Sequence, residues 1–307
     1  MSSHKQVYAG KSNKIKTPLS TTVFNGVGGT VLVITALLCL VPFVLLVSAS
    51  FTSDRSIAFD GFRLIPGEIS FEGYRILFRN PLVIARAYFV SIFVTTVGTV
   101  GGLLVTAAAA YPLSRTYFKY RFQIAFFFFF TTLFNGGLLS TYIFMVRYLQ
   151  LTNTYWAMIL PPMVQVFFLL IMRTFMSSIP ESIIEAAKID GANEFRIFFM
   201  LILPLSTAPL ATIGLFLALG YWNDWFNAML YVNRPEMFPL QYMLHNMLTA
   251  AEAIGRLAQL AEVRAVDIPT RSLRMAMTVI ATGPILLVYP FVQRYFIKGI
   301  TLGSVKG

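Results

Sequence analysis

Charged residues are scarce in this chain. They make up 12% of its 307 residues, and 57% are hydrophobic, whereas a soluble domain usually has about 25% charged residues. Cysteine is almost absent, and Cys39 alone cannot close an internal disulfide, which excludes a disulfide-stapled scaffold. His4 and His245 are the two histidines, so we expect neither a metal cluster nor a nucleophile–base pair. These deficits exclude an ordinary soluble enzyme and indicate a membrane protein.

A nucleotide-binding motif is also missing. No G-x-x-x-x-G-K-[ST] segment occurs in the chain, so any nucleotide chemistry would have to come from another subunit. The net charge of +11 could indicate nucleic-acid binding, but the basic residues border apolar stretches instead of forming one patch. We therefore expect no catalytic residues, cofactor, metal or nucleic-acid partner in this chain.

Long charge-free stretches define the expected membrane spans. A central charged residue costs about 2.5–3.5 kcal/mol on insertion scales, and a bilayer core needs about 20 helical residues. Six charge-free gaps are long enough, which predicts an all-α membrane protein with six transmembrane helices in one domain, residues 22–297. The expected spans are 24–49, 88–111, 122–146, 153–173, 207–231 and 274–296.

Lysines predict the orientation of these spans. An even number of spans places both termini on one side, with an N-terminal tail of residues 1–21 and a C-terminal tail of residues 298–307. All the lysines then fall on that side: Lys5, Lys11, Lys14, Lys16, Lys119, Lys188, Lys298 and Lys306. Because positive charge accumulates on the cytoplasmic side, both termini are expected to be cytoplasmic.

The first span has a second interpretation. Ser48-Ala49-Ser50 follows the apolar stretch and resembles a signal-peptide cleavage site. The stretch from Val27 to Val47 is, however, far longer than the usual signal-peptide core of about 7–15 residues. We therefore favour an uncleaved first helix.

The fourth connection, residues 177–204, has the pattern of two short helices around a glycine. Ser178 and Glu181 have the spacing of a capping box, and Pro180 lies where a first helical turn tolerates it. Gly191 can end this helix, and Asn193 can cap the next one. The expected apolar face comprises Ile179, Ile183, Ala186 and Ala187. Such an elbow on the inner surface could bind a partner protein, or it could be an interfacial loop helix without a partner.

The elbow resembles a known motif. Glu185-Ala186-Ala187, Gly191 and Leu201-Ile202-Leu203-Pro204 look like the EAA loop of ATP-binding-cassette importer permeases, although Leu201 stands where Ile is usual. Residues 299–307 are similar to the tail of the maltose-type permease, and so is Trp222-Asn223-Asp224-Trp225. The resemblance covers nearly the whole chain and is closest to permeases for complex polysaccharides and oligosaccharides.

This resemblance implies a fold, partners and roles. It implies the type I importer permease fold in the bacterial cytoplasmic membrane. The implied partners are a second permease, which we expect to be a different chain, two ATPase subunits that hold ATP and Mg, and an extracytoplasmic solute-binding protein. The residues implied in ATPase coupling are Glu185, Ala186, Ala187, Asp190, Gly191, Leu203 and Pro204, with Gly303, Lys306 and Gly307 in the tail.

The fifth span ends in the densest polar-aromatic cluster of the chain. Aromatic rings beside amides and a carboxylate suit a carbohydrate, whose ring has apolar patches edged by hydroxyls. An aromatic belt at the membrane interface is the alternative. The candidate pathway residues are Tyr221, Trp222, Asn223, Asp224, Trp225 and Asn227.

Two other classes of protein compete with a carbohydrate importer permease. A self-sufficient secondary transporter or channel usually has several intramembrane ionisable residues or an inverted repeat, whereas here Asp224 stands nearly alone and no repeat is found. A membrane-embedded enzyme would need a cluster of catalytic groups, which the two histidines do not provide. The permease interpretation fits the sequence best.

Overall fold

Helices make up nearly all of the regular structure. The computed structural model describes residues 19–260 and 270–304. These residues contain one isolated β-bridge, Thr52 to Ile69, and no strand. The helices before the elbow are α1 (Leu19–Ser50), α2 (Asp54–Asp60), α3 (Glu72–Leu77), α4 (Pro81–Ser114), α5 (Arg121–Leu133), α6 (Gly137–Ile143), the π-helical turn η1 (Phe144–Tyr148), α7 (Trp156–Ile159) and α8 (Val166–Ser177). The later ones are α9 (Glu181–Ile189), α10 (Glu194–Ile197), the π-helical turn η2 (Phe198–Ile202), α11 (Leu203–Leu205), α12 (Thr207–Asn223), α13 (Phe226–Tyr231), the 3-10 turn η3 (Pro235–Met237), α14 (Leu240–Leu260) and α15 (Thr270–Ser304).

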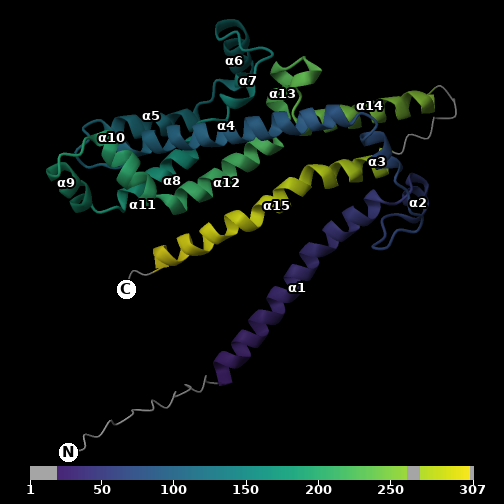
Figure 1. Cartoon of the computed structure of the whole chain (residues 1–307), viewed down its shortest axis with the longest axis horizontal. Coiled ribbons are helices and arrows are strands. Elements are labelled where there is room, and N and C mark those ends of the chain that lie inside the picture. The colour runs from purple at the N-terminus through teal and green to yellow at the C-terminus, as the bar shows by residue number, and fades with distance from the viewer. Residues whose placement is uncertain (1–18, 261–269, 305–307) are drawn as a thin grey trace, which may run out of the picture.

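Helix α4 is the central element, with α8 and α12 packed against it (Figure 1). Glycines allow α12 to approach closely. A Cβ atom on Gly98 would lie 2.6 Å from Cε1 of the Tyr221 ring, and one on Gly102 would lie 2.9 Å from the Met163 carbonyl oxygen. Because no other residue leaves this space free, Gly98 lets the Tyr221 ring lie directly on the α4 backbone, and Gly102 does the same for the Met163 carbonyl.

Membrane-crossing length is reached by single helices and by bent pairs. Two helices, residues 24–50 of α1 and the whole of α4, are each long and apolar enough to cross a membrane. Three bent pairs pass the same test together, so up to five crossings are available among the described residues.

Three of the expected spans are less regular than a straight helix. The third, 122–146, is broken between α5 and α6, which meet at 111°, because Asn135-Gly136-Gly137 interrupts the helix and Gly137 has a φ of +79°. The fourth is broken at Pro161-Pro162 before α8, as expected for a ring that lacks an N–H donor. The fifth helix ends at Asn223 instead of continuing to residue 231.

The first and last helices are joined at one end of the molecule. Carboxylate oxygen Oδ1 of Asp54 accepts hydrogen bonds from the backbone N–H groups of Arg271 and Ser272, at 2.7 and 3.0 Å, where α15 begins. Tyr74 donates to the Ser50 hydroxyl at 2.9 Å at the end of α1. Helix α15 is helical to Ser304, so it extends beyond the expected end of the last span and into the residues assigned to the C-terminal tail.

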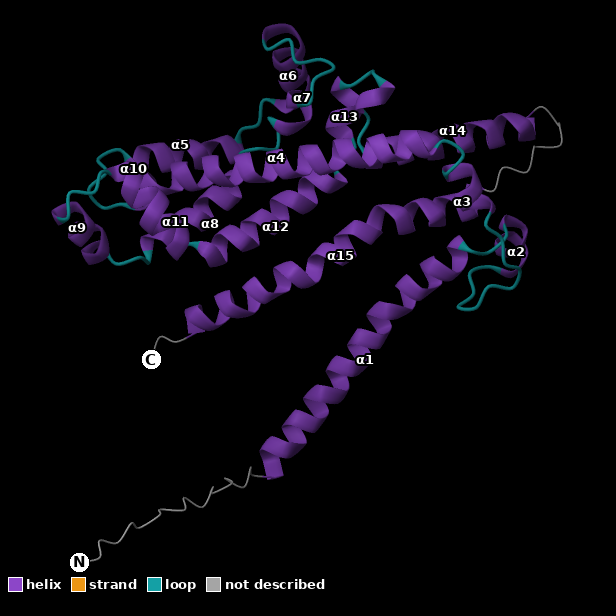
Figure 2. Cartoon of the chain, viewed as in Figure 1, coloured by secondary structure: helices purple, strands orange, loops and turns teal. Residues whose placement is uncertain are grey.

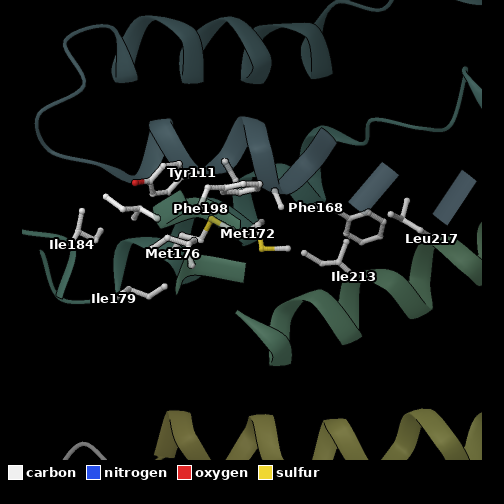
Figure 3. Close-up of a cluster of buried hydrophobic side chains, with 13 residues drawn as sticks. Tyr111, Phe168, Met172, Met176, Ile179, Ile184, Phe198, Ile213 and Leu217 are labelled. Carbon is white, nitrogen blue, oxygen red and sulfur yellow. The ribbon is translucent and has the colours of Figure 1, made fainter. Parts of the chain in front are cut away.

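The elbow lies at the opposite end. Figure 2 shows α9, the start of α1 and the C-terminal end of α15 toward one end of the molecule, whereas α2 and α3 lie toward the other. An apolar core at the elbow end is formed by α4, α8, α9, α10, η2 and α12 (Figure 3). Side chains of the elbow are therefore buried in the same core as side chains of α4, α8 and α12.

Candidate coupling elbow and outer patch

The elbow, residues 177–204, is built from short helices joined at a glycine. Helix α9 ends at Ile189, and Gly191 then has a φ of +78°, the left-handed conformation that glycine adopts without strain. The Asn193 side chain accepts a hydrogen bond from the Arg196 backbone N–H at 2.8 Å and so caps α10. The roles predicted for Gly191 and Asn193 in ending and starting these helices are confirmed.

The predicted capping box is wrong. The Ser178 hydroxyl donates to the Phe175 carbonyl, so it belongs to the end of α8, and α9 starts after Pro180 without a side-chain cap. Glu181 is therefore free to contact another element. Its Oε1 atom accepts hydrogen bonds from the Thr116 hydroxyl and from the Thr116 backbone N–H, the latter at 3.2 Å. These bonds lower the pKa of the Glu181 carboxyl below its ordinary value.

The predicted apolar face is confirmed at Ile179 and Ala187, which pack in the core, but it is wrong at Ile183 and Ala186, which are exposed. Ile184 is 2% exposed and lies in the core of Figure 3, whereas Ile183, which was expected to be apolar-facing, is 39% exposed. One residue corresponds to about 100° around a helix. Ala186 is therefore exposed, and Ile189, which was not part of the predicted face, is 86% exposed.

The exposed face of α9 carries Glu185. Its side chain is exposed and makes no hydrogen bond or ion pair with the described residues. Ala186, Asp190 and Gly191 are also exposed. The remaining predicted coupling residues differ in environment: Ala187 and Leu203 pack against the core, and Pro204 is exposed. In the C-terminal segment Gly303 lies in the last turn of α15, whereas Lys306 and Gly307 lie outside the described residues.

A polar cluster holds the two halves of the elbow together, and sequence reasoning missed it. Glu194 accepts a hydrogen bond from the Tyr111 hydroxyl at 2.7 Å and forms an ion pair with Lys188 at 2.7 Å. The Tyr117 hydroxyl lies 3.2 Å from the same carboxylate, and Lys188 Nζ lies 4.0 Å from the centre of the Tyr117 ring. Burial opposes ionisation of Glu194, but Lys188 and Tyr111 outweigh it and lower the pKa of this carboxyl.

Four of the six candidate pathway residues are structural. Tyr221 is buried and its hydroxyl donates to the Ile159 carbonyl at 2.7 Å, and the Trp222 indole N–H donates to the Ala281 carbonyl at 3.0 Å. Asp224 acts as the cap of α13, because its carboxylate accepts from the Asn227 backbone N–H at 3.1 Å and from the Asn227 amide at 2.6 Å. These four side chains therefore hold the bend after α12.

Asn223 and Trp225 remain exposed and meet two residues of α14. The Gln241 amide donates to Asn223 Oδ1 at 3.4 Å, and the His245 ring stacks on the Trp225 ring at 4.3 Å between centroids. We call Asn223, Trp225, Gln241 and His245 the outer patch. Gln241 and His245 were not predicted as site residues, although their spacing of four places them on one face of a helix.

The elbow and the bend after α12 contain several carboxylates. Within the described ranges, no three His, Cys, Asp or Glu side chains gather closely enough to hold a metal ion. Carboxylates there are engaged with hydroxyls, amides and Lys188, or they face outward as Glu185 does.

An all-helical chain with bent, apolar helices and an exposed elbow at one end has the features of a membrane transport subunit. The family model described as "Binding-protein-dependent transport system inner membrane component" matches residues 102–302. The chain belongs to this family of inner-membrane transport permeases, and it has the fold of ATP-binding-cassette importer permeases.

Relatives with named roles cover almost the whole chain. The polygalacturonan/rhamnogalacturonan transport system permease protein YtcP of Bacillus subtilis is 40% identical over 89% of this chain and 94% of its own length. Protein LplC of the same organism is 38% identical over 87% of this chain and 90% of its own length. A bacterial ABC transporter that imports the acidic polysaccharide alginate contains a chain that is 29% identical, with a TM-score of 0.75 over 91% of this chain and 99% of that one.

Proposed function

We propose that this chain is a permease subunit of an ATP-binding-cassette importer that moves oligosaccharides or polysaccharide fragments into the cell. The proposal places it in the bacterial plasma membrane beside a second, different permease, two ATPase subunits that bind ATP and Mg, and an extracytoplasmic solute-binding protein. The named roles of YtcP and of the alginate importer support the substrate class. Uronate-bearing oligosaccharides are therefore the first substrates to test.

The proposed topology has six crossings and both termini in the cytoplasm. It keeps the domain limits derived from the sequence: tails of residues 1–21 and 298–307, and a transmembrane domain of residues 22–297. Lysines on one side of the expected spans support it. The position of α9 toward the same end as the start of α1 and the end of α15 also supports it (Figure 2).

The observation that carries the proposal is the free face of α9. Glu185 has no partner among the described residues, and Ile189 beside it is 86% exposed. A carboxylate and an apolar side chain left open on the cytoplasmic side are suited to a basic and apolar cleft of another protein. We assign this face to an ATPase subunit. The proposed coupling set is Glu185, Ala186, Ala187, Asp190, Gly191, Leu203 and Pro204, with Gly303, Lys306 and Gly307 of the tail reaching the same partner.

ATP would act by shifting a population of conformations. Closure of the ATPase pair favours an outward-facing state, and the elbow converts that closure into movement of the helices above it. Of the candidate pathway residues, we propose that Asn223 and Trp225 contact the carbohydrate together with Gln241 and His245. Tyr221, Trp222, Asp224 and Asn227 act by holding the bend that presents them.

The test uses the whole importer in proteoliposomes. Glu185→Ala and Gly191→Pro should leave the complex inserted, while sugar uptake for each ATP hydrolysed falls. Ser182→Ala, an exposed position on the same helix, is the matched control and should behave as the unaltered protein. Normal uptake for each ATP in both elbow variants would contradict the assignment.

A further inference from the structure

Arg115 is a buried cation at the junction of α4 with the elbow. It follows the last residue of α4 and is 1% exposed. Its Nε donates to the Ser114 hydroxyl at 2.9 Å, Nη1 to the Ile179 carbonyl at 3.5 Å and Nη2 to the Met176 carbonyl. The ion pairs found among the described residues do not include Arg115. A charge that is buried in this way is compensated by oxygen acceptors and not by a carboxylate in direct contact.

Both acceptors lie where α8 ends and leads into α9. Met176 belongs to the last turn of α8, and Ile179 lies in the short joint between α8 and α9. The C-terminal carbonyls of a helix carry partial negative charge and lack helical donors, so a guanidinium is favoured beside them. A reciprocal contact exists: Arg173 of α8 donates through Nε to the Leu113 carbonyl at the end of α4, at 3.0 Å. Each helix thus supplies a cation to the C-terminal end of the other.

The joint between α8 and α9 is short and sharply bent, so few backbone hydrogen bonds of its own hold it. Only Ser178, Ile179 and Pro180 separate α8 from α9, and the two helices are bent by 73°. Pro180 has no N–H group and cannot contribute a helical hydrogen bond there. The further contacts between the elbow and the connection after α4 are exposed: Glu181 with Thr116, and Glu194 with Tyr117. Arg115 therefore supplies the buried hydrogen bonds to the α8–α9 joint itself, in addition to the apolar core and the Tyr111–Glu194 bond that join the elbow to α4.

We infer that Arg115 is a positioning residue for ATP-driven transport, because it fixes the α8–α9 joint to the end of α4. When an ATPase moves α9, this clamp passes the movement to α4, the central helix of the membrane domain. The planar fork of the guanidinium reaches the Met176 and Ile179 carbonyls together, which a single ammonium group cannot do. The inference rests on the proposed function, since it requires α9 to be driven by a partner.

The first experiment measures sugar uptake for each ATP hydrolysed by the complete importer in proteoliposomes. Arg115→Met removes every hydrogen bond at similar length, and we expect the ratio to fall about tenfold or more, as for loss of hydrogen bonds to a charged group. Arg115→Lys keeps the charge without the fork and should be intermediate. Lys119→Met removes an exposed cation from the same connection and should leave the ratio unchanged. Equal, proportional losses of uptake and hydrolysis in both Arg115 variants would overturn the inference.

The second measurement follows the joint itself. Spin labels at Ser182→Cys on α9 and Val105→Cys on α4, in a Cys39→Ser background, report the distance between the two helices. We expect a broader distance distribution in Arg115→Lys than in the unaltered background, with the complex still assembled. An unchanged distribution would overturn the inference. A wild-type importer whose uptake is independent of ATP would instead refute the proposed function, so the two failures are distinguishable.

Discussion

Replacing Gly98 by alanine should disturb the contact between α4 and α12. The new methyl carbon would lie 2.6 Å from two Tyr221 ring carbons, well inside van der Waals contact. The ring cannot withdraw freely, because its hydroxyl is bonded to the Ile159 carbonyl at 2.7 Å and the residue is 4% exposed. Overpacking of this kind costs about 1–3 kcal/mol, and loss of the hydrogen bond would add about 1 kcal/mol. Helix propensity returns about 1 kcal/mol. We expect a net destabilisation of about 1–3 kcal/mol.

The assay is unfolding of the purified chain in mixed detergent micelles, followed by circular dichroism. Gly220→Ala is the matched control, since a Cβ atom there meets nothing within 4 Å. It should be neutral or stabilising by up to about 1 kcal/mol. In a Tyr221→Leu background the cost of Gly98→Ala should largely disappear, because the clashing ring is gone.

If Gly98→Ala and Gly220→Ala have the same effect on the free energy of unfolding, the close approach of Tyr221 to α4 does not make a methyl group at residue 98 destabilising. If the cost of Gly98→Ala persists in the Tyr221→Leu background, the cause lies elsewhere in α4. Either outcome would remove the α4–α12 contact as the anchor of the bend that presents the outer patch.

Three further predictions concern the elbow and the outer patch. Asn193→Ala should weaken the start of α10 by about 0.5–2 kcal/mol, seen as faster amide exchange at Arg196, and unchanged exchange would contradict the cap. Because the pKa of Glu194 is lowered in the folded state, its stabilising contribution should be present above the ordinary carboxyl pKa and be lost as pH falls through the folded value. Amide protection of the elbow should therefore decrease on acidification, less so in Glu194→Gln, and an identical decrease in both would refute this. Trp225→Ala should raise the transport Michaelis constant more than Asp224→Asn, since asparagine can still cap α13, and equal constants in both variants and the wild type would exclude the outer patch from the pathway.

Local signals in the sequence predicted much of the elbow. Gly191 and Asn193 act on backbone groups within a few residues of themselves, so their roles follow from residue type and spacing. The capping box failed because Ser178 and Glu181 have the right spacing but belong to different helices. The prediction of the buried face of α9 was wrong at Ile183, because Ile184 is the buried residue. Both are isoleucines, and only the packing of the core distinguishes them.

Contacts between distant residues could not be predicted from spacing. Thr116 and Glu181 are separated by 65 residues, and Tyr111 and Glu194 by 83. Charge-free gaps identify apolar segments from composition, which does not show where a helix bends. The 111° bend between α5 and α6 was therefore not predicted. Asn135-Gly136-Gly137 was the available signal for that bend. The stacking of the His245 ring on Trp225 likewise joins two separate helical segments, so spacing alone did not predict it.

We propose that a separate ATPase drives transport by moving the elbow. The most direct measurement compares uphill uptake of a labelled oligosaccharide into liposomes by this chain alone and by the complete importer with ATP. We predict accumulation only with the complete importer, and loss of that accumulation in Glu185→Ala despite continued ATP hydrolysis. Uphill accumulation by the chain alone, without any ATPase subunit, would show that the elbow is not driven by a separate ATPase.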